Sequence, residues 1–381
     1  MLVCAGTDYK LAPLEIRERL AFNEQQAADI IKKISSINNV SGCVVLSTCN
    51  RSELYVSSCG DVDAAGLLVE CSYADKKDIR DKIKLYTGDE AVYHLFETAC
   101  GLNSAMHRES QIITQISRSA DLSRELECMD SELDVLFRTA VSSARKAAST
   151  ANNERGLSSA FAAVERLSSL CNLKGKKCLV IGNGQVGRLA AHLLRDRGAE
   201  VTITLRVYKN GENIIPSGCG SIPYNERVKA IDKSDILLSA TKSPHYTVTA
   251  DMMKDINKPS YIIDLAVPRD IEPSAAEGAV YFNIDDFSVK SEGDLSEVYE
   301  IIEDGIAEYT AWYNYRTAID DIESIKDIMA QRIVKSTGYD EELVREVAAR
   351  SADMIFGGMK SVITPLAVEQ CHKKIRERAR L

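Results

Sequence analysis

Short apolar runs alternate with amphipathic stretches over residues 1–155, which predicts a small sheet beside helices. The run at 43–46 is continuously apolar, as in a buried strand, and residues 54–56 predict a second strand. Asn23 and Gln26 have the spacing of a capping box and predict the start of a helix. Further expected elements are a strand at 2–6 and helices at 61–71, 77–86, 90–102, 109–126 and 131–150. We therefore expect an α+β domain over residues 1–155.

From residue 156 onward strands and helices alternate, which is typical of a parallel sheet with helices on its faces. Residues 177–181 and 200–205 are apolar runs of strand length, and residues 189–197 between them have helical spacing. Further expected elements are a helix at 158–173 and strands at 236–240, 261–266 and 280–282. This pattern predicts an α/β domain over residues 156–290.

A glycine motif, G-N-G-Q-V-G, joins the strand at 177–181 to the following helix. In this setting the glycines permit a tight turn, a close pyrophosphate and close helix packing, although the same turn also occurs without a ligand. The next strand is followed by an arginine and by no acidic residue, which favours the 2′-phosphate of NADP. The sequence thus predicts a Rossmann-type domain that binds NADPH. The expected cofactor-binding residues are Gly182, Asn183, Gly184, Gln185, Val186, Gly187 and Arg206.

Residues 291–381 have the apolar spacing of helices. Leu295, Val298, Ile302 and Ile306 recur at intervals of three and four, and no proline lies between residues 291 and 364. The pattern predicts one long helix, followed by helices around 344–355 and 361–378. Because a helix of this kind cannot bury its apolar stripe alone, we expect a dimerisation domain here and a homodimer.

Composition restricts the class of protein. The net charge of −9 over 381 residues excludes a general attraction to nucleic acid, so any RNA contact needs a local basic patch. The 11 cysteines form no C-x-x-C pair and the five histidines are scattered, which predicts a reducing cytoplasm and no metal site. The N-terminus lacks a secretory pattern, and no stretch approaches the roughly 18 apolar residues of a membrane span.

Cys49 lies between the two strands of the first domain, close to Arg51. A nearby cation stabilises the thiolate, the reactive form of cysteine, so Cys49 is a candidate nucleophile. Arg51 could also hold a substrate carboxylate with its planar guanidinium. The alternative is that Cys49 is a small residue packed in a strand turn.

Other polar residues on predicted helices have two interpretations each. His94 is either a packed residue of a half-apolar helix or a general acid or base. Glu109, Gln111 and Gln115 share one side of a helix and either line a polar pocket or form a solvated face.

Five stretches together resemble the glutamyl-tRNA reductase family. Residues 47–53 (S-T-C-N-R-S-E) are similar to its S-T-C-N-R-x-E signature, and residues 264–271 match its D-L-A-V-P-R-D-I. Residues 12–22, 94–104 and 109–115 resemble A-P-x-x-I-R-E-x-x-x-F, H-L-F…G-L-[DN]-S and E-x-Q-I-x-x-Q. The resemblance extends over almost the whole chain.

This resemblance implies NADPH-dependent reduction of glutamyl-tRNA(Glu) to glutamate-1-semialdehyde, the first step of five-carbon tetrapyrrole biosynthesis. Cys49 would attack the ester to form a thioester, and His94 would be an acid or activity-tuning group. It also implies a V-shaped homodimer with a long spinal helix, and a glutamate-1-semialdehyde aminomutase as a partner. The implied substrate-binding positions are Thr48, Asn50, Arg51, Ser104, Glu109, Ser110, Gln111 and Gln115.

The sequence also departs from the family pattern. Arg108, preceded by His107, replaces the usual glycine before Glu109, and residues 6–10 lack the usual N-H-K. A catalytically silent paralogue that binds tRNA or a pathway partner is therefore an alternative. A small-molecule dehydrogenase is a third, but it explains neither the Cys49 stretch nor the long C-terminal helix.

Overall fold

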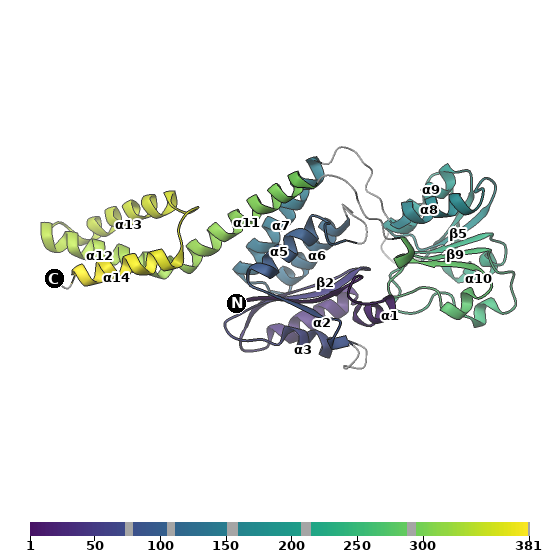
Figure 1. Cartoon of the computed structure of the whole chain (residues 1–381), viewed down its shortest axis with the longest axis horizontal. Coiled ribbons are helices and arrows are strands. Elements are labelled where there is room, and N and C mark those ends of the chain that lie inside the picture. Colours follow the sequence, from purple (N-terminus) through teal and green to yellow (C-terminus); the bar gives the residue numbers. More distant parts are fainter. Residues whose placement is uncertain (73–78, 105–110, 151–158, 207–214, 288–294, 380–381) are drawn as a thin grey trace.

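Three parts of the protein follow one another along a single long axis (Figure 1). The computed structural model describes residues 1–381 except 73–78, 105–110, 151–158, 207–214, 288–294 and 380–381. The N-terminal α+β part lies in the middle, with the parallel-sheet part at one end and the C-terminal helices at the other. The expected fold class is confirmed. The expected domain boundaries at 155/156 and 290/291 lie outside the described residues and stay predictions.

A four-stranded antiparallel sheet organises the N-terminal part, with the strand order β2-β3-β1-β4. The two inner strands are β3 (Arg51–Ser58) and β1 (Leu2–Asp8), whose residues are all buried. The edges are β2 (Val40–Ser47) and β4 (Lys84–Thr87). β2 and β3 are consecutive in the sequence, as expected, and a hairpin turn containing Cys49 joins them.

Two local predictions have opposite outcomes. The capping box is confirmed, because the Gln26 N–H donates to Asn23 Oδ1 at 3.0 Å and the Asn23 N–H donates to Gln26 Oε1 at 2.8 Å. The predicted helix at 77–86 is wrong over its last residues, which belong to β4. The aromatic Tyr86 favours a strand, and pairing with β1 satisfies the backbone groups of an otherwise open sheet edge.

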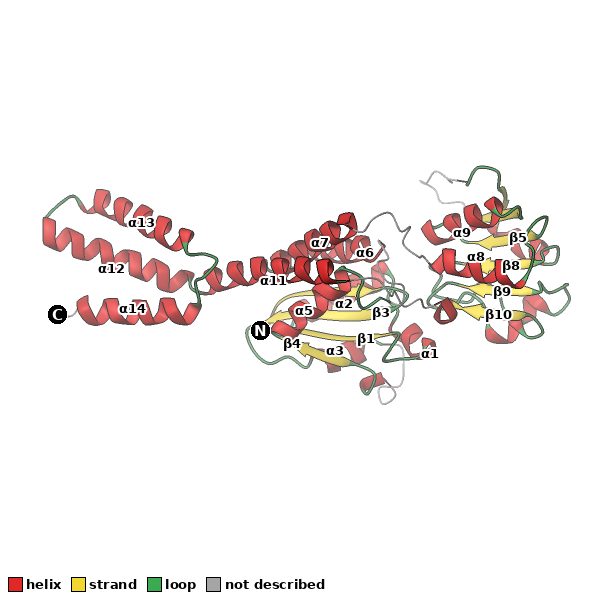
Figure 2. Cartoon of the chain, turned by 45° about the horizontal axis from the view of Figure 1, so that its top comes forward, coloured by secondary structure: helices red, strands yellow, loops and turns green. Residues whose placement is uncertain are grey.

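Helices cover both faces of this sheet and produce two separate cores (Figure 2). Because side chains alternate across a strand, Val44 and Leu46 enter the core under α5, α6 and α7, whereas Cys43 and Val45 enter the core under α2 and α3. The helices of this part are α1 (Leu14–Arg17), the 3-10 turn η1 (Glu18–Leu20), α2 (Glu24–Ser35), α3 (Ala64–Cys71), α5 (Asp89–Ala99), α6 (Gln111–Glu125) and α7 (Ser131–Thr150).

A six-stranded parallel sheet forms the second part, with the order β10-β9-β8-β5-β6-β7. The chain starts at β5 in the interior and adds strands first on one side and then on the other, which creates the crevice where such sheets bind ligands. Strand β7 was not predicted, and α9 begins at Gln185 rather than at Leu189. The elements are α8 (Ser159–Leu170), β5 (Lys177–Ile181), α9 (Gln185–Asp196), β6 (Glu200–Leu205), β7 (Gly220–Pro223), α10 (Arg227–Ile231), β8 (Ile236–Ser239), β9 (Tyr261–Asp264), β10 (Val280–Asn283) and the 3-10 turn η5 (Ile284–Phe287).

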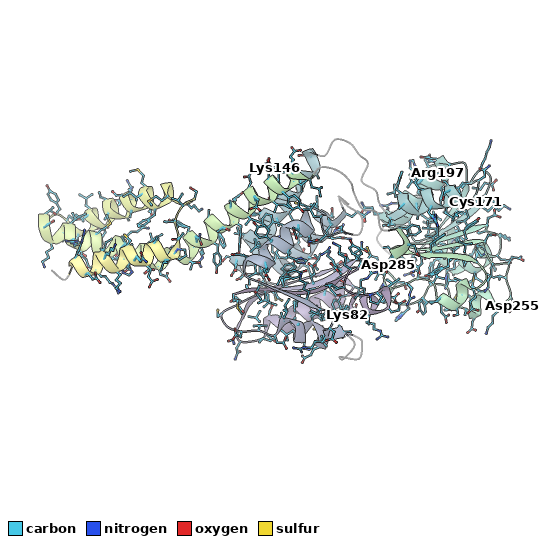
Figure 3. All side chains as sticks on the ribbon, viewed as in Figure 1. Lys82, Lys146, Cys171, Arg197, Asp255 and Asp285 are labelled. Atoms are coloured by element: carbon cyan, nitrogen blue, oxygen red, sulfur yellow. The ribbon has the colours of Figure 1, made fainter. Side chains whose placement is uncertain are left out.

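The chain then returns to the first part as α11 (Ser296–Thr317), which lies along α7 and completes its core (Figure 2). The predicted long helix is interrupted at Ala318, where α12 (Ile319–Thr337) starts. With α13 (Glu341–Gly358) and α14 (Pro365–Ala379), α12 forms a helical bundle that projects away from both other parts (Figures 1 and 3).

Gly305 allows the close approach of α11 to the first part. A Cβ atom at this position would overlap the Ser143 hydroxyl and lie 2.6 Å from Phe96 Cε1. We expect Gly305→Ala to lower the free energy of unfolding by about 1–3 kcal/mol, since overpacking forces the helices apart. Chemical denaturation followed by circular dichroism measures this change.

Gly357→Ala is the matched control, because Gly357 also lies in a helix but a Cβ atom added to it would have no neighbour within 4 Å. Alanine there should be neutral or stabilising by up to about 1 kcal/mol. Equal stabilities of the two variants would show that α11 does not depend on a close contact at Gly305.

Candidate active site at the junction of two domains

The turn between β2 and β3 presents Cys49. The Thr48 N–H donates to the Arg51 carbonyl at 2.8 Å, and the Thr48 hydroxyl oxygen accepts from the N–H groups of Asn50 and Arg51, each at 3.2 Å. These bonds close a tight turn. The Thr48 hydroxyl satisfies backbone N–H groups that no longer pair with the neighbouring strand. Cys49 is half-buried, whereas Asn50 is buried. The sequence-based placement of Cys49 between two strands is confirmed.

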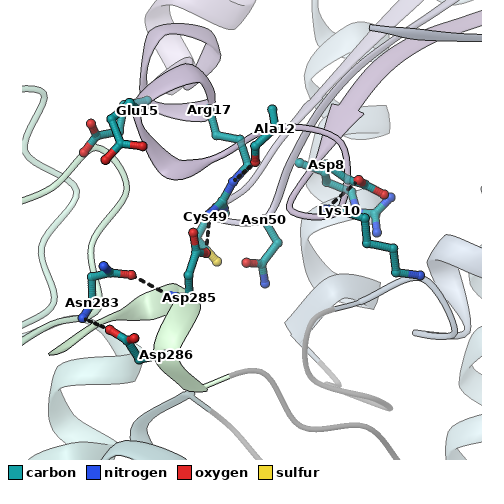
Figure 4. Close-up of polar contacts among 12 residues, drawn as sticks. Asp8, Lys10, Ala12, Glu15, Arg17, Cys49, Asn50, Asn283, Asp285 and Asp286 are labelled. Atoms are coloured by element: carbon teal, nitrogen blue, oxygen red, sulfur yellow. Dashed lines mark hydrogen bonds and ion pairs between the residues drawn. The ribbon is translucent and has the colours of Figure 1, made fainter. Parts of the chain in front are cut away.

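Arg17 reaches the same turn from α1. Its Nη1 donates to the Cys49 carbonyl at 2.6 Å, and its Nε donates to the Ala12 carbonyl at 3.3 Å. The remaining nitrogen, Nη2, pairs with Asp285 of η5 in the parallel-sheet part (Figure 4). Arg17 was not among the predicted site residues. The only sequence signal for it is its place in the A-P-x-x-I-R-E stretch.

Arg51, at the start of β3 next to the turn, belongs to a buried network centred on Glu53. Arg51 Nη1 donates to Glu53 Oε1 at 2.6 Å, His94 Nε2 lies 2.8 Å from the same oxygen, and the Tyr55 hydroxyl donates to Oε2 at 2.8 Å. Burial alone would raise the pKa of the Glu53 carboxyl, but Arg51 and His94 outweigh it and hold that pKa at about 2. Glu53 is therefore an anion throughout the physiological range.

This network determines how two predicted residues are oriented. The Arg51 guanidinium also donates to the Thr98 hydroxyl and to the Asn103 carbonyl, so its described partners all lie inside the domain. The His94 ring stacks on the Tyr86 ring with 3.9 Å between their centroids. Their predicted roles, as a carboxylate binder and as an acid, stay predictions. In this conformation both side chains bind the Glu53 carboxylate in the interior of the domain.

Cys4, Glu53 and His94 bring three possible metal-ligand atoms within 4.8 Å of one another. However, the Glu53 oxygen that faces His94 already accepts from the Arg51 cation. Burial, with the charge of Glu53, also raises the pKa of the Cys4 thiol well above its usual range. These groups are thus already committed to one another, and the arrangement does not favour a bound cation.

The remaining predicted substrate-pocket residues have different outcomes. Ser104 is buried, and its carbonyl accepts from the Tyr9 hydroxyl at 3.4 Å, while the Tyr9 N–H donates to the Asn50 carbonyl at 3.0 Å. Gln111 and Gln115 are half-buried in the first turns of α6. The predicted pocket residues Glu109 and Ser110 lie outside the described part of the chain, as do His107 and Arg108, where the sequence departs from the family pattern.

The glycine loop after β5 has the geometry of a dinucleotide site. Gly182 has φ +113°, and a Cβ there would overlap the Ala240 carbonyl. A Cβ at Gly187 would overlap the Gly182 carbonyl, so α9 packs closely against the loop. In contrast, no atom of the described residues lies within 4 Å of a Cβ position at Gly184, which caps α9. This open space before a helix N-terminus fits a pyrophosphate.

Residues 264–271 hold the loops at the carboxyl ends of β8 and β9. Asp270 accepts hydrogen bonds from the Ser239 hydroxyl at 2.6 Å, the Thr241 N–H at 2.8 Å and the Thr241 hydroxyl at 2.5 Å. Asp264 accepts from the N–H groups of Ala266 and Ile271. Burial and the neighbouring Asp270 raise the pKa of Asp264 to about 8. The two aspartates of the D-L-A-V-P-R-D-I stretch therefore fix the loops that follow β8 and β9, at the sheet edge where such folds bind ligands.

Arg206 lies at the end of β6 beside two residues that sequence reasoning missed. The guanidinium carbons of Arg206 and Arg227 are each 4.2 Å from the centroid of the Tyr224 ring. Cation–π stacking restrains a long side chain, so Tyr224 and Arg227 support a positive site at this strand end. They were missed because neither follows a recognisable spacing from the glycine loop.

Fold and site together define a nicotinamide dinucleotide-dependent oxidoreductase that carries a cysteine on a separate domain. Residues 5–151 match the family described as "Glutamyl-tRNAGlu reductase, N-terminal domain", and residues 163–289 match "Shikimate / quinate 5-dehydrogenase". The glutamyl-tRNA reductase of Acetivibrio thermocellus is 38% identical over 328 residues, which cover 83% of this chain and 98% of that protein. The chain therefore belongs to the glutamyl-tRNA reductase family, and the resemblance inferred from its motifs is confirmed.

Two further relatives complete the comparison. The "Probable multifunctional siroheme biosynthesis protein HemA" of Ruminiclostridium josui is 40% identical over 326 residues, or 83% of this chain, and the match spans 63% of that protein. The solved glutamyl-tRNA reductase from Methanopyrus kandleri has 25% sequence identity and a TM-score of 0.46, with 100% of this chain and 99% of that chain covered.

The Glu53 network generates a stability prediction. Glu53→Gln leaves the buried Arg51 without a counter-charge, so we expect the free energy of unfolding at pH 7 to fall by about 3–5 kcal/mol. Because the pKa of Glu53 is depressed from its ordinary 4.5 to about 2, its contribution is complete above pH 4.5 and disappears as the pH falls toward 2. Urea denaturation across this pH range measures the difference in free energy of unfolding, with Glu97→Gln on α5 as the control. A difference between wild type and Glu53→Gln that does not change with pH would contradict the assignment.

Proposed function

We propose that this chain is a glutamyl-tRNA reductase that uses NADPH and a Cys49 thioester to make glutamate-1-semialdehyde. The observation that carries the proposal is the position of Cys49 at the tip of the β2–β3 hairpin. Arg17 donates to the Cys49 carbonyl and also pairs with Asp285 of the parallel-sheet part. Relatives named glutamyl-tRNA reductase support it. They also favour an enzyme over the silent paralogue, as do the intact Cys49 turn and glycine loop.

Cys49 carries the first step. Its sulfur attacks the ester carbonyl carbon of glutamyl-tRNA, a C–S bond forms, and the C–O bond to the terminal ribose breaks. The ribose oxygen leaves with the proton that the thiol gave up. Thr48 and Arg17 fix the backbone on both sides of the sulfur-bearing residue, so the nucleophile is positioned before the substrate arrives.

The second step returns Cys49 to its starting state. A thioester carbonyl is less resonance-stabilised than an ester carbonyl and therefore accepts hydride more readily. NADPH, which the glycine loop and Arg206 would hold, would supply that hydride. The C–S bond then breaks, the sulfur leaves as a thiolate that takes up a proton, and the acyl carbon becomes the aldehyde of glutamate-1-semialdehyde.

The glycine loop fits the cofactor. The open space at Gly184 and the N-terminus of α9 would receive the pyrophosphate, with Asn183, Gln185 and Val186 around it. Arg206, restrained by Tyr224, would hold the 2′-phosphate that distinguishes NADPH from NADH.

The C-terminal bundle supports a homodimer. Large apolar side chains on α13 and on the residues before α14 are exposed, with Met354 at 78% and Val362 at 70%. A second copy of this chain is the partner that the family resemblance implies for these exposed side chains. A glutamate-1-semialdehyde aminomutase would then take the reactive aldehyde directly.

The state of the cysteines supports the proposed compartment. All 11 cysteines, each within the described residues, are free of disulfide bonds, which supports a reducing cytoplasm. Among the described helices, none has the length and apolar character needed to cross a bilayer.

Cys49→Ser should abolish the labelled protein thioester and lower aldehyde formation by at least about 10³-fold, since serine is a poor nucleophile without an activating base. Single-turnover reaction with radiolabelled glutamyl-tRNA, first without and then with NADPH, measures both steps. Cys59→Ser, an exposed cysteine of the same domain, should react like wild type. Aldehyde formation by Cys49→Ser at the wild-type rate would remove Cys49 from the mechanism.

Arg206→Glu should weaken NADPH binding by roughly 2–3 kcal/mol, or about 30- to 150-fold, because a charged hydrogen bond becomes a repulsion. NADH binding should change far less. Titration of both cofactors by fluorescence tests the assignment, with the exposed Lys233→Glu as a charge-matched control on the same domain. Equal losses for NADPH and NADH would rule out Arg206 as the 2′-phosphate site.

A further inference from the structure

Two sets of ion pairs of opposite polarity join the first part to the parallel-sheet part. In one, the cation Arg17 comes from α1 and the anion Asp285 from η5. In the other, the cation Arg269 comes from the parallel-sheet part and pairs with Glu18, through Nε at 2.8 Å and Nη2 at 2.9 Å, and with Glu15 at 3.3 Å. Crossed charges of this kind define a single docked orientation.

Only one of these sets touches the nucleophile. Arg17 donates to the Cys49 carbonyl at 2.6 Å, and Figure 4 shows Arg17, Cys49 and Asp285 together. The Arg17 side chain is 2% exposed, although it is a charged group at a domain junction. Arg269 and its two glutamates have no bond to the Cys49 turn among the contacts of the described residues.

Asp285 is held in a fixed turn. The Asp285 N–H donates to Asn283 Oδ1 at 2.9 Å, and the Asn283 N–H donates to Asp286 Oδ2 at 2.7 Å (Figure 4). This turn directly follows β10 of the parallel sheet. Asp285 therefore moves together with the parallel sheet, and its distance from Arg17 depends on where the sheet lies.

We propose that Arg17 is a positioning residue that couples docking of the cofactor domain to the placement of Cys49. The proposal rests on the function proposed above and adds that docking of the two domains controls the position of its nucleophile. When the domains dock, Asp285 supplies the counter-charge that lets the Arg17 guanidinium remain buried against the Cys49 carbonyl. When they separate, Arg17 loses this partner, and the hydrogen bond that aligns the Cys49 turn is no longer enforced.

The separation of the two chemical steps tests this coupling. Thioester formation is measured with labelled glutamyl-tRNA alone, and aldehyde formation is measured after NADPH is added to the preformed thioester. We expect Arg17→Lys to slow both steps about tenfold, since an ammonium cannot bond two partners in this geometry. Asp285→Asn should likewise slow both steps about tenfold, because the Arg17 guanidinium then loses the counter-charge that keeps it against the Cys49 carbonyl.

Glu18→Gln is the matched control, because it removes a junction charge that does not reach Cys49. It should slow aldehyde formation less than Asp285→Asn and leave thioester formation unchanged. In a double-mutant cycle, Arg17→Lys and Asp285→Asn should be non-additive, whereas Arg17→Lys and Glu18→Gln should be additive. Thioester formation by Arg17→Lys at the wild-type rate, or equal effects of Asp285→Asn and Glu18→Gln, would overturn the proposal.

A readout independent of the reaction separates this proposal from the proposed function. The rate at which iodoacetamide alkylates Cys49, followed by peptide mass spectrometry in the absence of substrate, should differ at least about threefold between Arg17→Lys and wild type, and Glu18→Gln should match wild type. If wild type forms no thioester, the proposed function fails, while the alkylation rates still decide whether Arg17 positions Cys49. Unchanged alkylation in a folded Arg17→Lys protein would contradict the coupling.

Discussion

The buried carboxylate of Glu53 is the interaction on which the N-terminal part depends. It lies opposite Gly6, where a Cβ would come within 2.6 Å of the Glu53 side chain, so the glycine makes room for it. Its two oxygens join Arg51 and Tyr55 of its own strand to His94 of α5. A charge buried this deeply is stable only while every partner is present, and this requirement fixes the helix over the sheet beneath the Cys49 turn.

Two arginines accordingly have different functions around the same cysteine. Arg51 is neutralised inside its own domain and gives the hairpin a rigid base. Arg17 is neutralised by a residue of another domain, so its counter-charge depends on how the two domains are docked. Sequence proximity favoured Arg51 as the residue that acts on Cys49, but the structure gives Arg17 the direct bond to the Cys49 backbone.

Sequence reasoning succeeded where the signal is local and failed where it is not. The capping box, the hairpin around Cys49 and the glycine loop each lie within a few consecutive residues, and the structure shows all three. Strand β4 was missed because its stability comes from the edge of β1, far away in the sequence. Arg17 was missed for the same reason, since it is 32 residues from Cys49 and 268 residues from Asp285. Tyr224 and Arg227 likewise meet Arg206 only after the parallel sheet has formed.

The packing of α7 against α11 has a consequence for motion. The cofactor domain is inserted between these two helices in the sequence, and the helices lie side by side in the same core. The domain is therefore connected to one rigid body at two positions, the end of α7 and the start of α11. Two connections restrict the positions that this domain can take relative to the first part more than a single linker would.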